Sequence, residues 1–526
     1  MGGKPVVEID LEPGLACAAV ARSARSTVAS LLLQQARLNP QRVAVDDGGR
    51  RLTYGEFVDR VRRLAGLLAA RGVGRGDRVA ILSENRAEYL EAYFASAWLG
   101  AILACQNWRL SARELAHCLD LVEPAALLVS PRHFPKLEEL GRAEAVIAFG
   151  DGYEAALAAA EPAGPEPLEA VDAEDPLLIL YTSGTTGLPK GAVIGHRAEI
   201  MRNLVIRAEF GIAPEDAFVA WSPLYHMGAA ECSIGALMTG GTVIVVDGFD
   251  QGRLAEVVAA EPLGWLLLMP GMVGAFADEL EHRGIKVELG RVRGVKVCGV
   301  MADLVPPADI ARITRLLGAP YANTFGATET GCPPCSSSLL PVGEAPARLS
   351  KRQSPFCEVK LVDADDVEVP DGQPGELAMR GPTLFSGYWR NPAANAHDFR
   401  GGWFHMGDVF RRNPDGTLDF VDRVKYLIKS GGENIYPAEI ERVLLADPRV
   451  ADAAVVRRPD PRWGEVPVAF VARRDDTLGA DELYARCRAE LAGYKQPKDI
   501  RFIAADAFPR SASGKIQRHE LEKRLP

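Results

Sequence analysis

The chain has 526 residues, 48% of them hydrophobic, and a formal net charge of −10 at pH 7. This length exceeds that of one ordinary domain and predicts two or three domains with sizeable cores. An acidic chain lacks the basic patch of a nucleic-acid-binding protein, so we expect a soluble enzyme and no nucleic acid as a partner.

The N-terminal residues do not fit a secretory signal, because Glu8, Asp10 and Glu12 stand where such a signal carries basic and then apolar residues. The longest apolar stretch, at 265–276, is interrupted by Pro270 and is about half as long as a membrane span of ~20 residues. The nine cysteines are an odd number for a disulfide framework and fit a reducing compartment. We therefore expect a cytoplasmic protein without a transmembrane segment.

The first quarter of the chain alternates helix and strand patterns. Ser26 and Thr27 can cap a helix whose apolar positions begin at Val28, and residues 54–71 repeat apolar side chains at helical spacing. A further helix is predicted at 87–98, and short buried strands at 79–82, 126–130 and 145–149. This alternation favours parallel sheets covered by helices, which is an α/β fold.

Two breaks divide the remaining sequence. Residues 152–174 are rich in Ala, Pro and Glu and predict a surface connection. A second break lies near 415–423, and the segment after it carries its own signals. These signals are helices at 438–446 and 480–492 and strands at 450–457 and 468–473. The prediction is a large N-terminal domain at 1–422 and a small α+β C-terminal domain at 423–526.

A loop rich in glycine and hydroxyl side chains follows the apolar strand at 178–180. Its sequence is Tyr-Thr-Ser-Gly-Thr-Thr-Gly-Leu-Pro-Lys-Gly, residues 181–191. Glycines let backbone N–H groups turn toward one point, hydroxyls add donors and Lys190 adds a positive charge, so the loop predicts a phosphate cradle. A flexible turn would explain the composition but neither the lysine nor the strand. The loop is no Walker motif, because Gly191 follows Lys190 and the glycine spacing differs.

Cys332-Pro-Pro-Cys335 has a spacing found in zinc sites and redox pairs. No second pair of cysteines at this spacing and no paired histidines accompany it. We therefore interpret the two residues as packed thiols, with a metal or redox pair as the alternative.

Five further segments follow the phosphate loop in a fixed order. They are 223–228 (PLYHMG), 323–330 (NTFGATET), 402–408 with 422–425 (GWFHMGD and DRVK), 430–441 (SGGENIYPAEIE) and 509–518 (PRSASGKIQR). Together with the loop they resemble the adenylate-forming superfamily of acyl-CoA synthetases, peptide-synthetase adenylation domains and beetle luciferases. The resemblance covers roughly residues 27–518. It implies a large N-terminal domain of parallel-rich sheets with a small barrel-like part, and a small mobile C-terminal domain.

The resemblance also implies an activity and a set of nucleotide-binding residues. The enzyme would use ATP, Mg²⁺ and a carboxylic acid to make an acyl-adenylate and pyrophosphate, and would then transfer the acyl group to coenzyme A, releasing AMP. Thr328 would contact the α-phosphate, Glu329 would bind Mg²⁺ and Phe325 would stack on adenine. Lys515 would reach the carboxylate and the α-phosphate together. The remaining ATP- and AMP-binding residues would be Thr182, Ser183, Gly184, Thr185, Thr186, Lys190, Asn323, Thr324, Asp408 and Arg423.

The same resemblance places the acid, the coenzyme A and a hinge. Lys425, within 423–426, would be the hinge about which the small domain rotates between the two half-reactions, and Gly431 and Gly432 would line a pantetheine tunnel. His226 would gate or pack against the acid. The acyl pocket would be formed by His226, Met227, Gly299, Val300, Met301, Phe325, Gly326, Ala327 and Gly331.

The identity of the acid is less determined. The predicted pocket residues are small or apolar apart from one histidine, and none is acidic, so no amino group is expected on the substrate. A fatty, aromatic or alicyclic acid is predicted. One alternative is adenylation with transfer to a carrier protein or to oxygen, and another is a nucleotide-binding scaffold without turnover. The small-molecule partners would be the acid, ATP and coenzyme A, and a homodimer is an open hypothesis.

Overall fold

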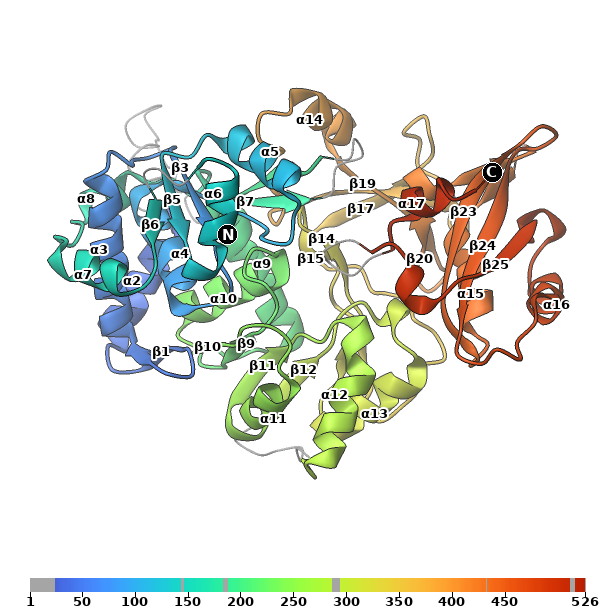
Figure 1. The fold of residues 1–526 in the computed structure, drawn as a ribbon, viewed down its shortest axis with the longest axis horizontal. Coiled ribbons are helices and arrows are strands. Elements are labelled where there is room, and N and C mark those ends of the chain that lie inside the picture. The colour runs from blue at the N-terminus through green and yellow to red at the C-terminus, as the bar shows by residue number, and fades with distance from the viewer. Residues whose placement is uncertain are drawn as a thin grey trace, which may run out of the picture. The chain divides into compact units, whose positions relative to one another are not determined.

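The computed structural model describes residues 24–142, 146–182, 188–285, 294–431, 433–510 and 516–525. These residues include no helix of the length and apolar character that a membrane crossing requires. The chain forms two compact units (Figure 1), Met1–Ala347 with Pro382–Pro392, and Arg348–Gly381 with Ala393–Pro526. The second unit thus begins upstream of the predicted division at 422/423, because an antiparallel sheet that starts after Arg348 groups with it. The hinge at 423–426 stays a prediction.

The first unit contains a six-stranded sheet in the order β6-β5-β3-β4-β7-β8. All neighbouring strands are parallel except β7 and β8, which pair antiparallel. The predicted α/β class with parallel sheets is confirmed. The strands are β3 (Arg78–Leu82), β4 (Ile102–Cys105), β5 (Ala126–Val129), β6 (Val146–Ala148), β7 (Pro176–Thr182) and β8 (Lys190–Gly195).

Among the described residues, this unit also contains two four-stranded sheets and a hairpin. Their orders are β2-β1-β10-β9 and β11-β12-β13-β16, and β14 pairs with β15. The strands are β1 (Val43–Asp46), β2 (Arg51–Thr53), β9 (Phe218–Ala220), β10 (Val243–Val245), β11 (Pro262–Leu266), β12 (Gly294–Cys298), β13 (Tyr321–Ala322), β14 (Phe325–Ala327), β15 (Gly331–Cys335) and β16 (Leu339–Leu340).

Helices of the first unit begin where the sequence supplies caps. Thr27 and Thr53 each accept a hydrogen bond from the backbone N–H three residues later, and Ser111 does the same. The three predicted N-terminal helices are confirmed. The helices are α2 (Val28–Leu38), α3 (Tyr54–Ala69), α4 (Ala87–Leu99), α5 (Ala112–Val122), α6 (Phe134–Glu139), α7 (Asp151–Ala159), α8 (Glu166–Ala170), α9 (His196–Phe210), α10 (Met227–Thr239), α11 (Gln251–Ala260), α12 (Val273–His282) and α13 (Pro307–Leu317).

The predicted surface connection at 152–174 is wrong in part, since α7 and α8 occupy much of it. Tyr153, Leu157 and Leu168 are buried there. Alanine favours helices, but the larger apolar residues are too few among prolines and glutamates to show a helical period, so the composition concealed two short helices that pack through one or two side chains each.

The second unit contains two sheets. The first has the antiparallel order β17-β18-β19-β20, and the second has the order β22-β21-β24-β23 with β25 beside β24. The hairpin of β23 and β24 separates two apolar cores, and α15 packs on β23 and on α16 (Figure 1). The elements are β17 (Glu358–Val362), β18 (Pro374–Arg380), α14 (Pro392–Asp398), β19 (Phe404–Arg412), β20 (Leu418–Arg423), β21 (Ile428–Ser430), β22 (Glu433–Ile435), α15 (Pro437–Leu445), β23 (Val450–Asp460), β24 (Gly464–Arg473), α16 (Ala480–Glu490), β25 (Asp499–Phe502) and α17 (Arg518–Glu522).

Candidate functional site

The predicted phosphate loop connects two strands of the six-stranded sheet. Thr182 ends β7, Lys190 begins β8, and the two residues pair across the antiparallel ladder. The sheet therefore fixes both ends of the loop. Ser183, Gly184, Thr185 and Thr186 lie outside the described residues. The half-buried Lys190 places its Nζ 3.7 Å from the ring centroid of Tyr388.

The predicted magnesium ligand, Glu329, lies in the turn between β14 and β15. The hydroxyl of Tyr388 donates a hydrogen bond to its Oε1 over 2.9 Å, and its backbone carbonyl accepts one from the N–H of Phe385 over 2.9 Å. The buried Thr330 accepts from the N–H of Ala327 with its Oγ1, also over 2.9 Å, which closes the turn. Glu329 is thus held through its carboxylate by Tyr388 and through its backbone by Phe385.

Among the residues that the structure describes, no group of three His, Cys, Asp or Glu side chains could hold a metal ion by itself. Mg²⁺ commonly binds through one or two carboxylates and completes its shell with substrate phosphates and water, so the single carboxylate of Glu329 is compatible with the predicted role. Thr328, the predicted α-phosphate contact, precedes Glu329 in the same half-buried turn, whereas Asn323 and Thr324 just before β14 are buried. Phe325 begins β14 and is half-buried.

The predicted acyl residues come from three neighbouring places in the first unit. His226 and Met227 start α10, Gly299 to Met301 follow β12, and the others belong to the β14–β15 hairpin. Gly299 has φ +75°, and a Cβ on it would lie 2.0 Å from the ring of Tyr321, so only glycine fits. The Tyr321 hydroxyl donates to the carbonyl of Val300 over 3.1 Å and fixes the turn.

The predicted ribose contacts lie in the second unit. Asp408 in β19 is directly opposite Arg423 in β20, and the Arg423 Nε lies 3.0 Å from the Asp408 Oδ1. Asp408 is 2% exposed. The adjacent Asp422 accepts hydrogen bonds from the backbone N–H groups of Arg423 and Ala438, each over 2.7 Å. Burial nevertheless raises the pKa of Asp422 to about 6.

The predicted hinge and coenzyme A residues follow β20. Lys425 lies in a short 3₁₀ turn with its Nζ 4.9 Å from the ring centroid of Tyr426. Gly431 has φ +60°, and a Cβ there would lie 2.7 Å from the Trp463 ring. Gly432 and Lys515 lie outside the described residues.

A buried charged cluster behind the β14–β15 hairpin was not predicted. Helix α9 packs on α10 and β15 and carries Arg202, which is 0% exposed and pairs directly with Glu231 of α10. The Arg202 Nε donates to the carbonyl of Thr383 over 2.7 Å. A Cβ on Gly331 would lie 2.8 Å from the Arg202 Cγ, so this arginine packs directly beneath the predicted acyl residue.

Glu199 extends this cluster. Burial, and to a smaller degree the neighbouring Glu231, raises the pKa of Glu199 well above its usual range. Its Oε1 accepts a hydrogen bond from the Asn203 amide over 2.9 Å. The sequence offered little signal, because α9 carries several charged residues and nothing in their spacing singles out the buried ones. Tyr388 was also missed, and its signal was the aromatic run Phe385, Tyr388 and Trp389.

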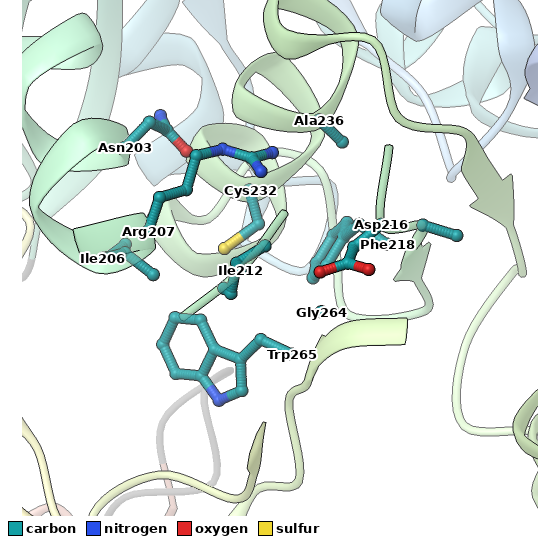
Figure 2. A pocket seen from close by; sticks show the side chains of 11 residues that line it. Asn203, Ile206, Arg207, Ile212, Asp216, Phe218, Cys232, Ala236, Gly264 and Trp265 are labelled. Atoms are coloured by element: carbon teal, nitrogen blue, oxygen red, sulfur yellow. The ribbon is translucent and has the colours of Figure 1, made fainter. Parts of the chain in front are cut away.

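Cys332 and Cys335 are both buried in β15. Nearby, a small cavity lies between α9, α10, β9 and β11, and Figure 2 shows Arg207, Asp216 and Trp265 among its lining side chains. Its volume is 30 Å³. A cavity of this size accommodates about one or two water molecules, whereas ligand pockets have about 300–1,000 Å³. It is therefore not the acid site.

Comparison with known proteins relates the chain to one family. A family profile described as AMP-binding enzyme matches residues 32–389, and one described as AMP-binding enzyme C-terminal domain matches residues 439–515. The chain is 37% identical to a feruloyl-CoA synthase of an Amycolatopsis species, over 94% of this chain and 98% of the relative. It is 33% identical to an indoleacetate–CoA ligase of Aromatoleum aromaticum, over 93% of this chain and 96% of the relative.

Solved structures are also similar to the chain along most of its length. The o-succinylbenzoate CoA synthetase of Bacillus subtilis, in complex with its acyl-adenylate intermediate, has a TM-score of 0.79 at 26% identity and covers 95% of this chain and 98% of its own. ATP-bound MatB of Rhodopseudomonas palustris has a TM-score of 0.80 at 26% identity, with coverages of 94% and 98%. The chain therefore belongs to the AMP-binding enzymes of the adenylate-forming superfamily, which confirms the family, the fold class and the prediction of an enzyme.

Proposed function

We propose that the chain is an ATP-dependent ligase that joins an aromatic carboxylic acid to coenzyme A. The observation that carries this proposal is near full-length similarity to CoA ligases named for feruloyl, indoleacetate and 2-succinylbenzoate substrates. Each of these acids contains an aromatic ring. Among the fatty, aromatic and alicyclic acids that the sequence left open, the aromatic class is therefore favoured, and coenzyme A is favoured over a carrier protein as the acceptor.

The first half-reaction forms the acyl-adenylate. A carboxylate oxygen attacks the α-phosphorus of ATP, and the bond to the bridging oxygen of pyrophosphate breaks. No protein nucleophile is needed, so catalysis rests on alignment and on offsetting the negative charge of both reactants. Lys190 and the loop before it would hold the β- and γ-phosphates, Thr328 would contact the α-phosphate, and Lys515 would neutralise the charge that develops between the reactants.

Glu329 would be the protein ligand of Mg²⁺, which when bound would offset charge on the phosphate oxygens. The geometry supports this role, since Tyr388 and the backbone of Phe385 hold the residue in place. In the second unit, Asp408 would accept hydrogen bonds from the ribose hydroxyls, because an ionised carboxylate is a strong acceptor. Arg423, paired with it, would contact the ribose or a phosphate.

The second half-reaction transfers the acyl group. The coenzyme A thiol attacks the acyl carbon of the adenylate, the bond to the phosphate oxygen breaks, and AMP leaves. Gly431 and Gly432 would line the path of the pantetheine, and rotation at Lys425 would exchange the half-reactions. The mixed anhydride hydrolyses readily, so the site must exclude water until the thiol arrives.

A homodimer remains a prediction.

The surroundings of the proposed acid site support a substrate without an amino group. The proposed lining residues are small or apolar apart from His226. The nearest acidic side chain along α10, Glu231, is buried and already paired with Arg202, so its carboxylate is engaged inside the protein. A ring stacked among glycines, methionine and Phe325 fits such surroundings better than a charged amine.

The experiment is acid-dependent pyrophosphate release across hydroxycinnamic, indoleacetic, succinylbenzoic, benzoic, fatty and amino acids, with and without coenzyme A. We expect release with an aromatic acid and consumption of one coenzyme A per pyrophosphate. Release with untouched coenzyme A would favour a carrier-protein acceptor. Release with fatty acids alone would refute the aromatic class, and no release with any acid would refute the ligase.

A further inference from the structure

The segment at 382–392, here called the return segment, joins two parts of the first unit that are distant in sequence. Its backbone pairs with β8, as the N–H of Val193 donates to the carbonyl of Gly387 over 2.9 Å and the N–H of Trp389 donates to that of Gly191 over 2.8 Å. Tyr388 forms a β-bridge with Ala192. The backbone of Tyr388 is therefore fixed to the strand that begins with Lys190.

The return segment is also anchored to the β14–β15 hairpin and to α9. The N–H of Phe385 donates to the carbonyl of Glu329 over 2.9 Å, and the carbonyl of Thr383 accepts from the buried Arg202 over 2.7 Å. The Phe385 ring meets the Tyr388 ring edge-on, with centroids 4.9 Å apart. These contacts leave Tyr388 with 5% of its surface exposed and little freedom to change rotamer.

The side chain of Tyr388 contacts both charged groups that the proposed function assigns to ATP. The Nζ of Lys190 lies 3.7 Å from the centroid of its ring, within cation–π range. Its hydroxyl donates to the Oε1 of Glu329 over 2.9 Å. One rigid phenol thus touches the proposed phosphate ligand through its face and the proposed magnesium ligand through its edge.

We propose that Tyr388 is a positioning residue for MgATP, which orients the ammonium of Lys190 with its ring and the carboxylate of Glu329 with its hydroxyl. The inference rests on the proposed roles of Lys190 and Glu329. A phenol has one hydrogen to donate, so it engages one carboxylate oxygen and the second oxygen remains a cation ligand.

Two physical reasons support this role. The lysine side chain has four rotatable bonds, and a ring that holds its end reduces the entropy lost when the ammonium meets phosphate. A carboxylate fixed by a charge-assisted hydrogen bond is oriented before the metal arrives, as the outer partners of metal ligands commonly ensure. The ring and the hydroxyl therefore act on different parts of MgATP, the phosphates and the metal ion, and two substitutions can separate their effects.

The test is the Mg²⁺ and ATP dependence of acid-dependent pyrophosphate release in Tyr388→Phe and Tyr388→Leu. Tyr388→Phe keeps the ring and loses the hydrogen bond, so we expect the Mg²⁺ concentration for half-maximal rate to rise about tenfold, with the KM for ATP at saturating Mg²⁺ changed less than about twofold. Tyr388→Leu loses both contacts, so the KM for ATP should rise as well, about fivefold or more.

Tyr153→Phe is the matched control. It also removes a buried hydrogen bond from a phenol to a carboxylate in the first unit, since Tyr153 donates to Glu91 over 2.5 Å. It lies outside the proposed site and should leave both concentration dependences unchanged. Should Tyr388→Leu fail to fold, Tyr388→Phe alone decides the Mg²⁺ part of the inference.

Glu329→Gln and Lys190→Ala separate this inference from the proposed function. If these variants keep the wild-type Mg²⁺ and ATP dependence, the proposed roles of the two residues are wrong. If they lose it while Tyr388→Phe matches the wild type in its Mg²⁺ dependence, the positioning role of the hydroxyl is overturned. An equal fall in rate in Tyr388→Phe at every Mg²⁺ concentration would likewise overturn it, because a merely structural defect acts in that way.

Discussion

His196, the first residue of α9, should make the stability of the first unit depend on pH. Its side chain is 0% exposed, and its Nδ1 accepts a hydrogen bond from the N–H of Val28 over 3.2 Å. A ring that accepts at Nδ1 is neutral with its proton on Nε2. Burial lowers the pKa of His196 from 6.5 to about 4, and the nearby Asp175 and Asp172 oppose this only in part. The positive end of the α9 dipole also disfavours an imidazolium at this position.

The direction in which stability changes with pH follows from proton binding. Between pH 6.5 and 4 the unfolded chain binds a proton at this histidine and the folded chain does not, so the free energy of unfolding falls as pH falls. The contribution of His196 is fully present above pH 6.5 and is lost as pH falls toward 4. A pKa difference of 2.5 corresponds to about 3 kcal/mol, with a slope of at most about 1.4 kcal/mol per pH unit.

The assay is urea unfolding of wild type and His196→Gln, followed by tryptophan fluorescence from pH 7 to pH 4.5. Other titrating groups are common to both proteins, so the difference between the two curves isolates His196. The variant should be less stable at pH 7, since the packing is disturbed, and should lose less stability on acidification. His282→Gln, at an exposed position of α12, is the control and should follow the wild type. Parallel curves for wild type and His196→Gln would refute the reasoning.

Three further predictions concern the proposed site and its support. Lys515→Ala should abolish most adenylation but spare thioester formation from a supplied acyl-adenylate, and equal loss of both half-reactions would contradict the assignment. Lys425→Pro should impair the second half-reaction more than the first because it fixes φ at the proposed hinge, and an unchanged rate of thioester formation would refute this. Arg202→Met should destabilise the first unit by about 3–5 kcal/mol, as it leaves Glu231 buried without its partner. Adding Glu231→Leu should recover much of that loss in denaturant unfolding, and no recovery would show that the loss does not come from the uncompensated charge of Glu231.

Much of this arrangement was predictable because local sequence determines it. The helix that starts after Thr27 and the strand that precedes the phosphate loop follow from caps and apolar runs, and the structure confirms both. The proposed site residues Lys190 and Glu329 were predicted from short motifs, and the strand pairs that carry them, β7–β8 and β14–β15, join segments close in sequence. The identity of the acid was not predictable in this way, since the proposed acyl residues come from several segments whose spacing depends on packing.

The residues that escaped prediction act only through distant contacts. Tyr388 is 59 positions from Glu329, and no periodicity or spacing links the two. Arg202 and Glu231 resemble ordinary charged positions on helices until α9 and α10 pack together and remove both from solvent. The α7 and α8 helices were missed because a few apolar residues among alanines carry too weak a pattern.

Two glutamates of the first unit show why position, rather than residue type, selects the proposed magnesium ligand. Glu231 is 2% exposed, burial raises its pKa, and its carboxylate forms an ion pair with Arg202. A metal that bound there would have to displace the arginine inside the protein, at the cost of an uncompensated buried charge. Glu329 instead lies in a half-buried turn, where a neutral phenol holds one oxygen without cancelling the charge. A carboxylate oriented by a neutral donor keeps its affinity for a cation, so the contact with Tyr388 supports the proposed role of Glu329 toward MgATP.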